Sequence, residues 1–363
     1  MLVPFKPSLW NADVTGRQAE ETGSVPHDSR PEHTGGEGTA AELVILIVSY
    51  NAQTAMMACL TAIEPLFRTC IAEVWVVDNA SSDNSAVMIA NRYPWAHLIQ
   101  NTRNVGFAAA VNQVVAVSRG AYVLLLNPDV LPMPKTVSLL LTFLRATPDC
   151  AGVGPLLLNP DGTEQQSAHA FPTPLRVLSE CLLGHRFTTR RRPGQAPVAV
   201  DAVVGACFLI RRAVIDAIGS LDERFFLYSE EVDWCLRAQR AGWRMYLLPE
   251  AMAVHGLAQS SKDQPEKGFV FLFRGRDQYM QKHFSPWARR VSHTGIVIGL
   301  LLRAVFWGIL SAVPASAERR KHRRSRYRRY KAVLRWYGEG RPDPHETNPV
   351  EVYETGKPTT RLF

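Results

Sequence analysis

Apolar runs that predict strands alternate with helical stretches in the first part of the chain. The predicted strands are 42–51, 73–83, 96–101 and 121–126, and the predicted helices are 53–68, 84–93 and one within 102–120. Each strand ends in polar residues. Strands that alternate with helices form a mostly parallel sheet with helices on both faces, so we expect an α/β fold. The polar strand ends should then converge at one edge of the sheet.

The pattern changes after about residue 150. We predict a strand with a hairpin turn at 151–165, a mobile basic loop at 183–197, a buried strand at 200–212, a loop leading into a helix at 221–243, and two short strands in 244–256. The helix is expected to stop at Gly242.

Candidate binding residues follow the predicted strands. They are Ser49, Tyr50 and Asn51 after the first strand, Asp78 and Asn79 after the second, Asn104, Gly106 and Asn112 around the third turn, and Asn127 and Asp129 after the fourth strand. Amide and carboxylate groups at such an edge suit a base and a ribose. The chain has neither a G-x-G-x-x-G nor a Walker motif, so a bound diphosphate needs a cation, and Asp129 is a hard oxygen ligand for one. Asn-Pro-Asp is also ordinary turn chemistry.

Three acids, Glu230, Glu231 and Asp233, open the helix predicted within 221–243. One interpretation is an acid-rich first turn, which the helix dipole favours. The flanking residues are apolar and aromatic, however, and a carboxylate in such a pocket suits general-base catalysis. His255 ends an apolar strand and is either a core or capping residue or a metal ligand.

Composition places the chain among ordinary globular proteins, with 46% hydrophobic and 20% charged residues. Six widely spaced cysteines without a C-x-x-C pair indicate packed thiols in a reducing compartment. Residues 1–40 have the composition of a disordered leader and lack an apolar signal-peptide core, so secretion is not expected.

Residues 293–313 are nearly long enough to span a bilayer, but Arg303 lies at their centre, at a cost of about 2.5–3.5 kcal/mol. We expect this helix to lie in the membrane interface; packing on the protein's own core is the alternative. The basic run 318–331 carries most of the net charge of +8 and favours an anionic membrane surface by about 1 kcal/mol per residue. A solvated tail is its alternative. The rest of the chain is nearly neutral, so no nucleic-acid partner is expected.

The segments "VSYN", "VVDNASSD", "NVGFAAAVNQ", "LLLNPDV", "GACFLIRR", "LDERFFLYSEEVDWCLRAQRAGW" and "VHG" occur in this order over about residues 43–284. Together they resemble the family 2 glycosyltransferases with a Rossmann-like GT-A fold, in their bacterial rhamnosyltransferase-like branch. The resemblance implies transfer, with inversion, from a nucleotide-sugar donor to a glycan in bacterial surface polysaccharide synthesis. The membrane element at 293–331 suggests that this acceptor is lipid-linked. It also implies Mg²⁺ or Mn²⁺. dTDP-rhamnose is the favoured donor, and UDP- and GDP-sugars are alternatives.

By this resemblance Asp129 matches the last acid of the family's D-x-D metal motif, and His255 matches a histidine of the metal or diphosphate site. Glu231 matches the general base. The other strand-end residues, including Ser49, Asn51, Asp78, Asn104 and Asn112, would border the nucleotide. Two positions depart from the commoner pattern: Asn127 replaces the first Asp of D-x-D, which puts tight metal binding in doubt, and Glu231 replaces Asp.

The resemblance divides the part it covers into a nucleotide-sugar-binding half at 41–150 and an acceptor-binding and catalytic half at 151–284. The apolar helix and the basic run behind it predict a membrane-associating segment at 285–335, followed by a flexible tail at 336–363. This segment favours a cytoplasmic location on the inner face of the plasma membrane. Two other functions stay open. A nucleotidyltransferase would need a basic, glycine-rich loop after the first strand, which "VSYNAQTAMM" lacks. A membrane-bound scaffold without activity is the other.

Overall fold

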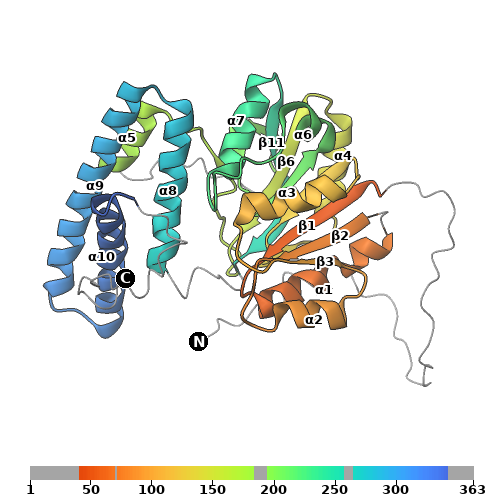
Figure 1. Ribbon diagram of the computed structural model, residues 1–363, viewed down its shortest axis with the longest axis horizontal. Coiled ribbons are helices and arrows are strands. Elements are labelled where there is room, and N and C mark those ends of the chain that lie inside the picture. The colour runs from red at the N-terminus through yellow and green to blue at the C-terminus, as the bar shows by residue number, and fades with distance from the viewer. Residues whose placement is uncertain (1–40, 70–71, 184–193, 257–264, 342–363) are drawn as a thin grey trace, which may run out of the picture.

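The computed structural model describes residues 41–69, 72–183, 194–256 and 265–341 (Figure 1). Within these residues, nine strands form a central sheet in the order β3-β2-β1-β4-β10-β6-β11-β5, with β8 paired to β11. The strands are β1 (Leu43–Ser49), β2 (Ala72–Asp78), β3 (His97–Gln100), β4 (Tyr122–Leu126), β5 (Val130–Pro132), β6 (Cys150–Leu158), β8 (Val198–Val200), β10 (Cys207–Arg211) and β11 (Arg244–His255). A small second sheet pairs β7 (Ala168–His169) with β9 (Ala202–Val203).

The sheet is mostly parallel, as predicted. β3, β2, β1 and β4 run side by side in one direction, and β6 and β11 are parallel to each other. β10 is antiparallel to both β4 and β6, so it joins the two parallel groups and gives them a common direction. The prediction of two short strands in 244–256 is wrong. A single strand, β11, runs through with a register shift between Leu248 and Met252, where Pro249 has no N–H to donate to the ladder.

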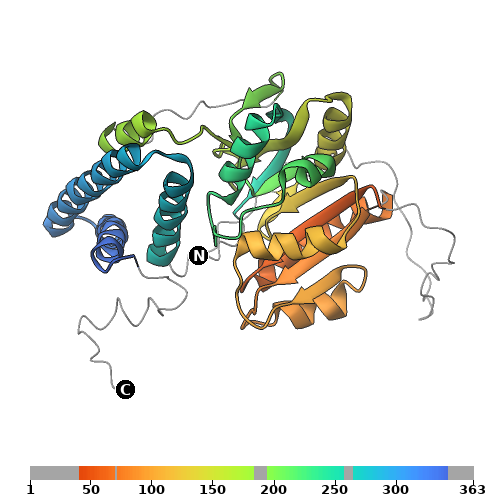
Figure 2. The ribbon, with the colours of Figure 1, turned by 45° about the horizontal axis from the view of Figure 1, so that its top comes forward.

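Helices cover both faces of the sheet (Figures 1 and 2). They are α1 (Gln53–Thr69), α2 (Ser85–Arg92) and α4 (Thr136–Ala146) on one face, and α3 (Phe107–Val117), α6 (Arg212–Ile218) and α7 (Glu230–Arg240) on the other. β1 shows why its sequence is continuously apolar. Leu43, Ile45 and Ile47 pack against the first set, and Val44 and Leu46 pack against the second, so both faces of the strand are buried.

Four further helices form a bundle beside the sheet: α5 (Pro174–Leu183), α8 (Pro265–His283), α9 (Pro286–Ala312) and α10 (Ala317–Gly338). Val177 of α5, Ile296 of α9 and Val333 of α10 share its small core. The sequence analysis expected a helix only around 293–313. α10 runs past the expected boundary at residue 335 because Trp336 is buried in the same core.

α9 is the only helix among the described residues that is long and apolar enough to cross a membrane. Its large apolar side chains stand exposed along one face: Ile298, Leu301, Leu302, Val305, Phe306 and Ile309. Arg303 lies on the other side, where its guanidinium donates to the carbonyl oxygens of Glu180 (3.0 Å) and Cys181 near the end of α5. The central guanidinium of the helix is therefore hydrogen-bonded inside the bundle and lies away from the exposed apolar face.

Three predicted features lie wholly or largely outside the described residues. They are the leader 1–40, most of the basic loop 183–197, and the tail beyond residue 341.

Candidate active site

The carboxyl ends of β1, β2 and β4 lie next to one another. Ser49 and Asp78 are direct partners in the β1–β2 register, and β4 pairs with the other side of β1. Both side chains are buried, and the Ser49 hydroxyl finds no hydrogen-bond partner among the described residues. The sheet thus brings the first predicted polar cluster together at one edge.

Two loops at this edge are tied to each other. The Asn51 side-chain oxygen accepts hydrogen bonds from the Ser82 N–H (2.7 Å) and hydroxyl (3.1 Å). The Asp78 carboxylate accepts from the Ser81 N–H (3.0 Å) and hydroxyl (2.5 Å). Tyr50 is 43% exposed between these loops. Asn51 and Asp78 therefore shape the loops, and the Tyr50 side chain is exposed to solvent.

A chain of amides supports the next loop. The Asn101 amide donates to Asn79 Oδ1 (2.9 Å), and the Asn79 amide donates to the Gly106 carbonyl oxygen (3.1 Å). Asn104 Oδ1 accepts from the Gly106 N–H (3.0 Å). The predicted residues Asn79 and Asn104 thus fix Gly106 from both sides.

Gly106 is required where it stands. Its φ is 89°, and an added Cβ would lie 2.5 Å from the Phe226 ring and 2.7 Å from the Phe226 carbonyl oxygen. That oxygen accepts the Phe107 N–H (2.7 Å) at the start of α3. The loop around Gly106 is therefore packed directly on the segment that leads to α7.

Asn112 faces the same segment. Its amide donates to the Leu221 carbonyl oxygen (2.9 Å) and to Glu223 (2.9 Å), and its oxygen accepts from the Ser220 hydroxyl (2.5 Å). These three bonds use both donors and one acceptor position of its amide group. Asn112 thus holds residues 220–223 in place, and its position beside a nucleotide stays a prediction.

Asp129 and His255 meet beyond the ends of β4 and β11. His255 Nε2 lies 3.5 Å from Asp129 Oδ1, and Gln165 Oε1 lies 2.6 Å from His255 Nδ1. The Asn127 N–H donates a hydrogen bond to the Ala206 carbonyl oxygen (2.8 Å). Within the described ranges, no group of three His, Cys, Asp or Glu side chains is arranged to hold a metal. Two ligands suit a cation that also binds phosphate oxygens, which is the usual way Mg²⁺ is held.

Glu230 and Glu231 form a buried acidic pair at the start of α7. Each has an Oε2 atom without a hydrogen-bond partner in the described chain. Burial raises the pKa of Glu231 to about 7. Burial, followed by the neighbouring charge of Glu231, raises the pKa of Glu230 well above its ordinary value. At least one carboxyl group of the pair therefore titrates near neutral pH, as a general base should.

The loop before this pair is strained. Tyr228 and Ser229 have φ values of 71° and 73°, an unusual pair of left-handed residues without a glycine. Burial, and then the charges of Glu230, Glu231 and Asp129, raise the pKa of the Tyr228 phenol. The charges of the acidic pair and of Asp129 thus act on the same phenol.

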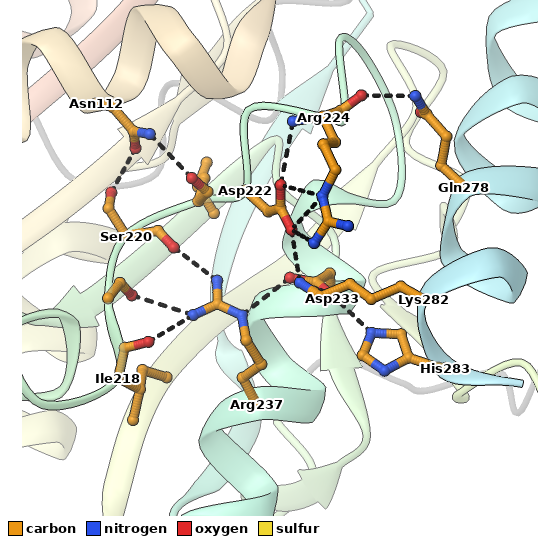
Figure 3. A network of polar contacts seen from close by, with 12 residues as sticks. Asn112, Ile218, Ser220, Asp222, Arg224, Asp233, Arg237, Gln278, Lys282 and His283 are labelled. Atoms are coloured by element: carbon orange, nitrogen blue, oxygen red, sulfur yellow. Dashed lines mark hydrogen bonds and ion pairs between the residues drawn. The ribbon is translucent and has the colours of Figure 1, made fainter.

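Asp233 differs from the two glutamates because its carboxylate is already occupied (Figure 3). Oδ2 accepts from Arg237 Nε (2.9 Å), and Oδ1 lies 2.7 Å from both Lys282 Nζ and His283 Nε2. The side chain is completely buried. Asp233 is the centre of an ion-pair network, and this leaves Glu230 and Glu231 as the candidate bases.

α8 is the part of the site that the sequence analysis missed. Lys282 also pairs with Asp222 (2.7 Å), and Gln278 donates to the Arg224 carbonyl oxygen (2.7 Å). α8 therefore holds the loop 221–229 before α7, here called the acidic loop, at several points (Figure 3). Gly275 allows this approach, since an added Cβ would lie 2.3 Å from the Tyr228 carbonyl oxygen. The spacing of four residues between Asp233 and Arg237 is a sequence pattern that predicts an ion pair on one helix. No sequence pattern predicts the contacts of α8, because their partners are distant along the chain.

The α/β domain thus carries an acid–histidine pair and a buried acidic pair. Residues 44–219 match the model of glycosyl transferase family 2. N-acetylglucosaminyl-diphospho-decaprenol L-rhamnosyltransferase of Mycobacterium tuberculosis is 29% identical over 72% of this chain and 88% of its own. Low-salt glycan biosynthesis hexosyltransferase Agl10 of Haloferax volcanii is 26% identical over 71% of this chain and 81% of its own.

Among solved structures, GalNAc-T7 with UDP, GalNAc and Mn²⁺ has the same fold, with a TM-score of 0.50 and 14% identity. The alignment covers 84% of this chain and 57% of that protein. Residues 44–219 thus form a glycosyl transferase family 2 domain, and the protein is a glycosyltransferase. Neither the nucleotidyltransferase nor the scaffold alternative is favoured.

Proposed function

We propose that this enzyme transfers a sugar from a nucleoside diphosphate to a hydroxyl group of a glycan, with inversion at the anomeric carbon. The observation that carries the proposal is the buried Glu230–Glu231 pair, with its raised pKa values and unpartnered oxygens, in the same site as Asp129. Such a carboxylate takes the proton from the acceptor hydroxyl as the oxygen attacks the anomeric carbon.

Glu231 is the base of choice. A Cβ added at Gly205 would lie 3.7 Å from Glu231 Cβ and Cγ and 4.0 Å from its carboxyl carbon, so this side chain runs past a position that carries no side chain of its own. Glu230 is the nearest alternative and shares the raised pKa. Asp233, paired with Arg237 and Lys282 and hydrogen-bonded to His283, is retained as a support for α7.

Asp129 and His255 are the residues that would hold Mg²⁺ or Mn²⁺. A cation held there with the donor would supply charge neutralisation for the departing diphosphate. With Asn127 in place of a second acid, the protein supplies one carboxylate in this motif. We infer that cation and donor bind together, each weakly without the other.

We favour dTDP-rhamnose as the donor, with UDP- and GDP-sugars as alternatives, and the name of the M. tuberculosis relative, an L-rhamnosyltransferase, supports rhamnose. The M. tuberculosis relative is named for an N-acetylglucosaminyl-diphospho-decaprenol acceptor. We infer a lipid-linked glycan acceptor of this kind, in the synthesis of a surface polysaccharide. The nucleotide would lie over residues 41–150 and the acceptor against residues 151–284.

The bundle supplies a surface for the membrane that such an acceptor requires. The exposed apolar face of α9 carries no charge, because Arg303 is turned into the bundle, and α10 beside it presents Arg319, Arg320 and Arg324 to solvent. An apolar stripe flanked by arginines suits a helix that lies in the interface of an anionic bilayer. We place the enzyme on the cytoplasmic face of the plasma membrane.

Titration calorimetry with dTDP-rhamnose, UDP-glucose and GDP-mannose, each with and without Mn²⁺, tests the proposal. We expect dTDP-rhamnose to bind most tightly, and only with the cation. Slow hydrolysis of the bound donor would separate an enzyme from a scaffold. Tight Mn²⁺ binding by the nucleotide-free protein, or no donor binding at all, would contradict the proposal.

A further inference from the structure

The turn after β6 lies beside the acid–histidine pair. The Gly162 N–H donates to the Asn159 carbonyl oxygen (2.9 Å), and Gly162 has a φ of 81°. Pro160 at the second position and a left-handed glycine after the turn are typical of a three-residue hairpin loop. The returning strand brings Gln165 next to His255, because β6 and β11 are neighbours.

The side chains of this turn form a hydrogen-bonded chain that begins at Asp161. The Asp161 carboxylate accepts the Thr163 hydroxyl (2.6 Å) and N–H (2.9 Å), and these bonds lower the pKa of Asp161. An ionised carboxylate can only accept hydrogen bonds. The Thr163 proton therefore points to Asp161, and the Thr163 oxygen is left as an acceptor.

The same direction continues through two amides. The Asn159 amide nitrogen donates to the Thr163 oxygen (3.0 Å), so Asn159 Oδ1 is the acceptor for the Gln165 amide nitrogen (3.1 Å). Gln165 Oε1 is then the only end of its amide left for His255 Nδ1, at 2.6 Å. A flipped Gln165 amide would set its oxygen against Asn159 Oδ1.

This direction fixes the tautomer of His255. Nδ1 must carry the hydrogen that Gln165 Oε1 accepts, so Nε2 of the neutral ring has a lone pair. Nε2 lies 3.5 Å from Asp129 Oδ1, and the two side chains are 22% and 11% exposed. A lone pair beside a carboxylate, partly open to solvent, is stable when a cation lies between them.

We propose that Gln165 is a positioning residue, which holds His255 in the Nδ1–H tautomer and so presents Nε2, together with Asp129, to the donor-bound cation. The cation role rests on the proposed function, but the tautomer is a property of the free protein. Hydrogen bonds of this kind to a metal-binding histidine typically change metal affinity by about 10–100-fold.

The test compares the wild type with Gln165→Leu, which removes the acceptor, and Gln165→Glu, which keeps one. Two-bond ¹H–¹⁵N spectra of histidine-labelled, metal-free protein at about pH 8.5, above the ordinary imidazole pKa, report the tautomer directly. We expect Nδ1–H in the wild type and in Gln165→Glu, and loss of this preference in Gln165→Leu. Folding is checked by the remaining histidine signals.

Mn²⁺ binding, followed by electron paramagnetic resonance in the presence of dTDP, gives the second readout. We expect Gln165→Leu to weaken it about 10–100-fold and Gln165→Glu to preserve it. An Nε2–H tautomer in the wild type, or an unchanged tautomer in Gln165→Leu, would overturn the proposal. An Nδ1–H tautomer in a protein that binds no Mn²⁺ with dTDP would support the orientation by Gln165 but contradict the cation site of the proposed function.

Discussion

Asp129 and Asp161 occupy the same place in two identical Leu-Leu-Leu-Asn-Pro-Asp segments, but only Asp161 finds partners within its own turn. Both turns close with a hydrogen bond from the fourth residue to the asparagine carbonyl oxygen, at 3.2 Å from Val130 and 2.9 Å from Gly162. Thr163 follows Gly162 and caps the Asp161 carboxylate. Val130 instead enters β5. The Asp129 carboxylate, without a local donor, faces His255.

Gly275→Ala tests the contact between α8 and the acidic loop. Helix propensity alone predicts a gain of up to about 1 kcal/mol for a glycine replaced in a helix. The methyl group would meet the Tyr228 carbonyl oxygen at 2.3 Å, so we expect lower stability and slower transfer. Gly308→Ala in α9 is the control, because its nearest neighbour lies at 3.4 Å. Urea unfolding should separate the two variants; a Gly275→Ala protein as stable as the control would refute the contact.

Asp233→Asn should be strongly destabilising. It removes the charge of a completely buried carboxylate that pairs with Arg237 and Lys282, and breaking such a buried ion pair typically costs about 3–5 kcal/mol. Arg224→Ala breaks an exposed pair with Asp222 and should cost at most about 1 kcal/mol. Guanidinium unfolding measures both free energies. Equal stabilities would mean that Asp233 is free to serve as a base after all.

The pair Leu302→Asp and Ile309→Asp tests the membrane surface on α9. Both side chains are exposed, at 60% and 64%, so the fold should tolerate the change while vesicle binding is lost. Val87→Asp on α2, exposed to 60%, is the matched control. Sedimentation with vesicles of anionic and of neutral lipid is the measurement. Unchanged binding of the double variant would exclude α9 as the docking helix.

The raised pKa of Glu231 predicts opposite effects of pH on activity and stability. Transfer needs the carboxylate, so the rate should rise as pH increases through about 7. Between pH 4.5, the ordinary pKa of a glutamate, and about pH 7, Glu231 keeps its proton in the folded protein but loses it in the unfolded chain. The free energy of unfolding should therefore fall as pH rises through this window. Glu231→Gln should show a flatter stability profile, measured by thermal unfolding across pH. A profile identical to that of the wild type would mean that Glu231 titrates normally.

Much of the sheet could be predicted because its physical causes are local. β1 and β4 are buried on both faces, so their sequences are continuously apolar, and each ends where polar loop residues begin. The parallel arrangement then placed Ser49 beside Asp78 without any further information. Site residues that lie at the carboxyl ends of strands could therefore be predicted from the sequence.

Other roles depend on partners that are distant in the sequence. Asp233 looked like a third candidate base, since nothing nearby reveals Lys282 and His283 some fifty residues later. Asn112 likewise turned out to bind residues 220–223. The two Leu-Leu-Leu-Asn-Pro-Asp segments make the same point, because their different roles arise from the residues that follow and from the neighbouring strands.

The most direct test of the proposed function compares wild type and Glu231→Gln in two assays: transfer from dTDP-rhamnose to an N-acetylglucosaminyl-diphospho-polyprenol, and calorimetric binding of the donor with Mn²⁺. Loss of a general base typically lowers the rate about 10²–10⁴-fold. We predict a loss of this size for Glu231→Gln, with donor affinity nearly unchanged. Near-normal transfer by Glu231→Gln would contradict the assignment and move the base to Glu230.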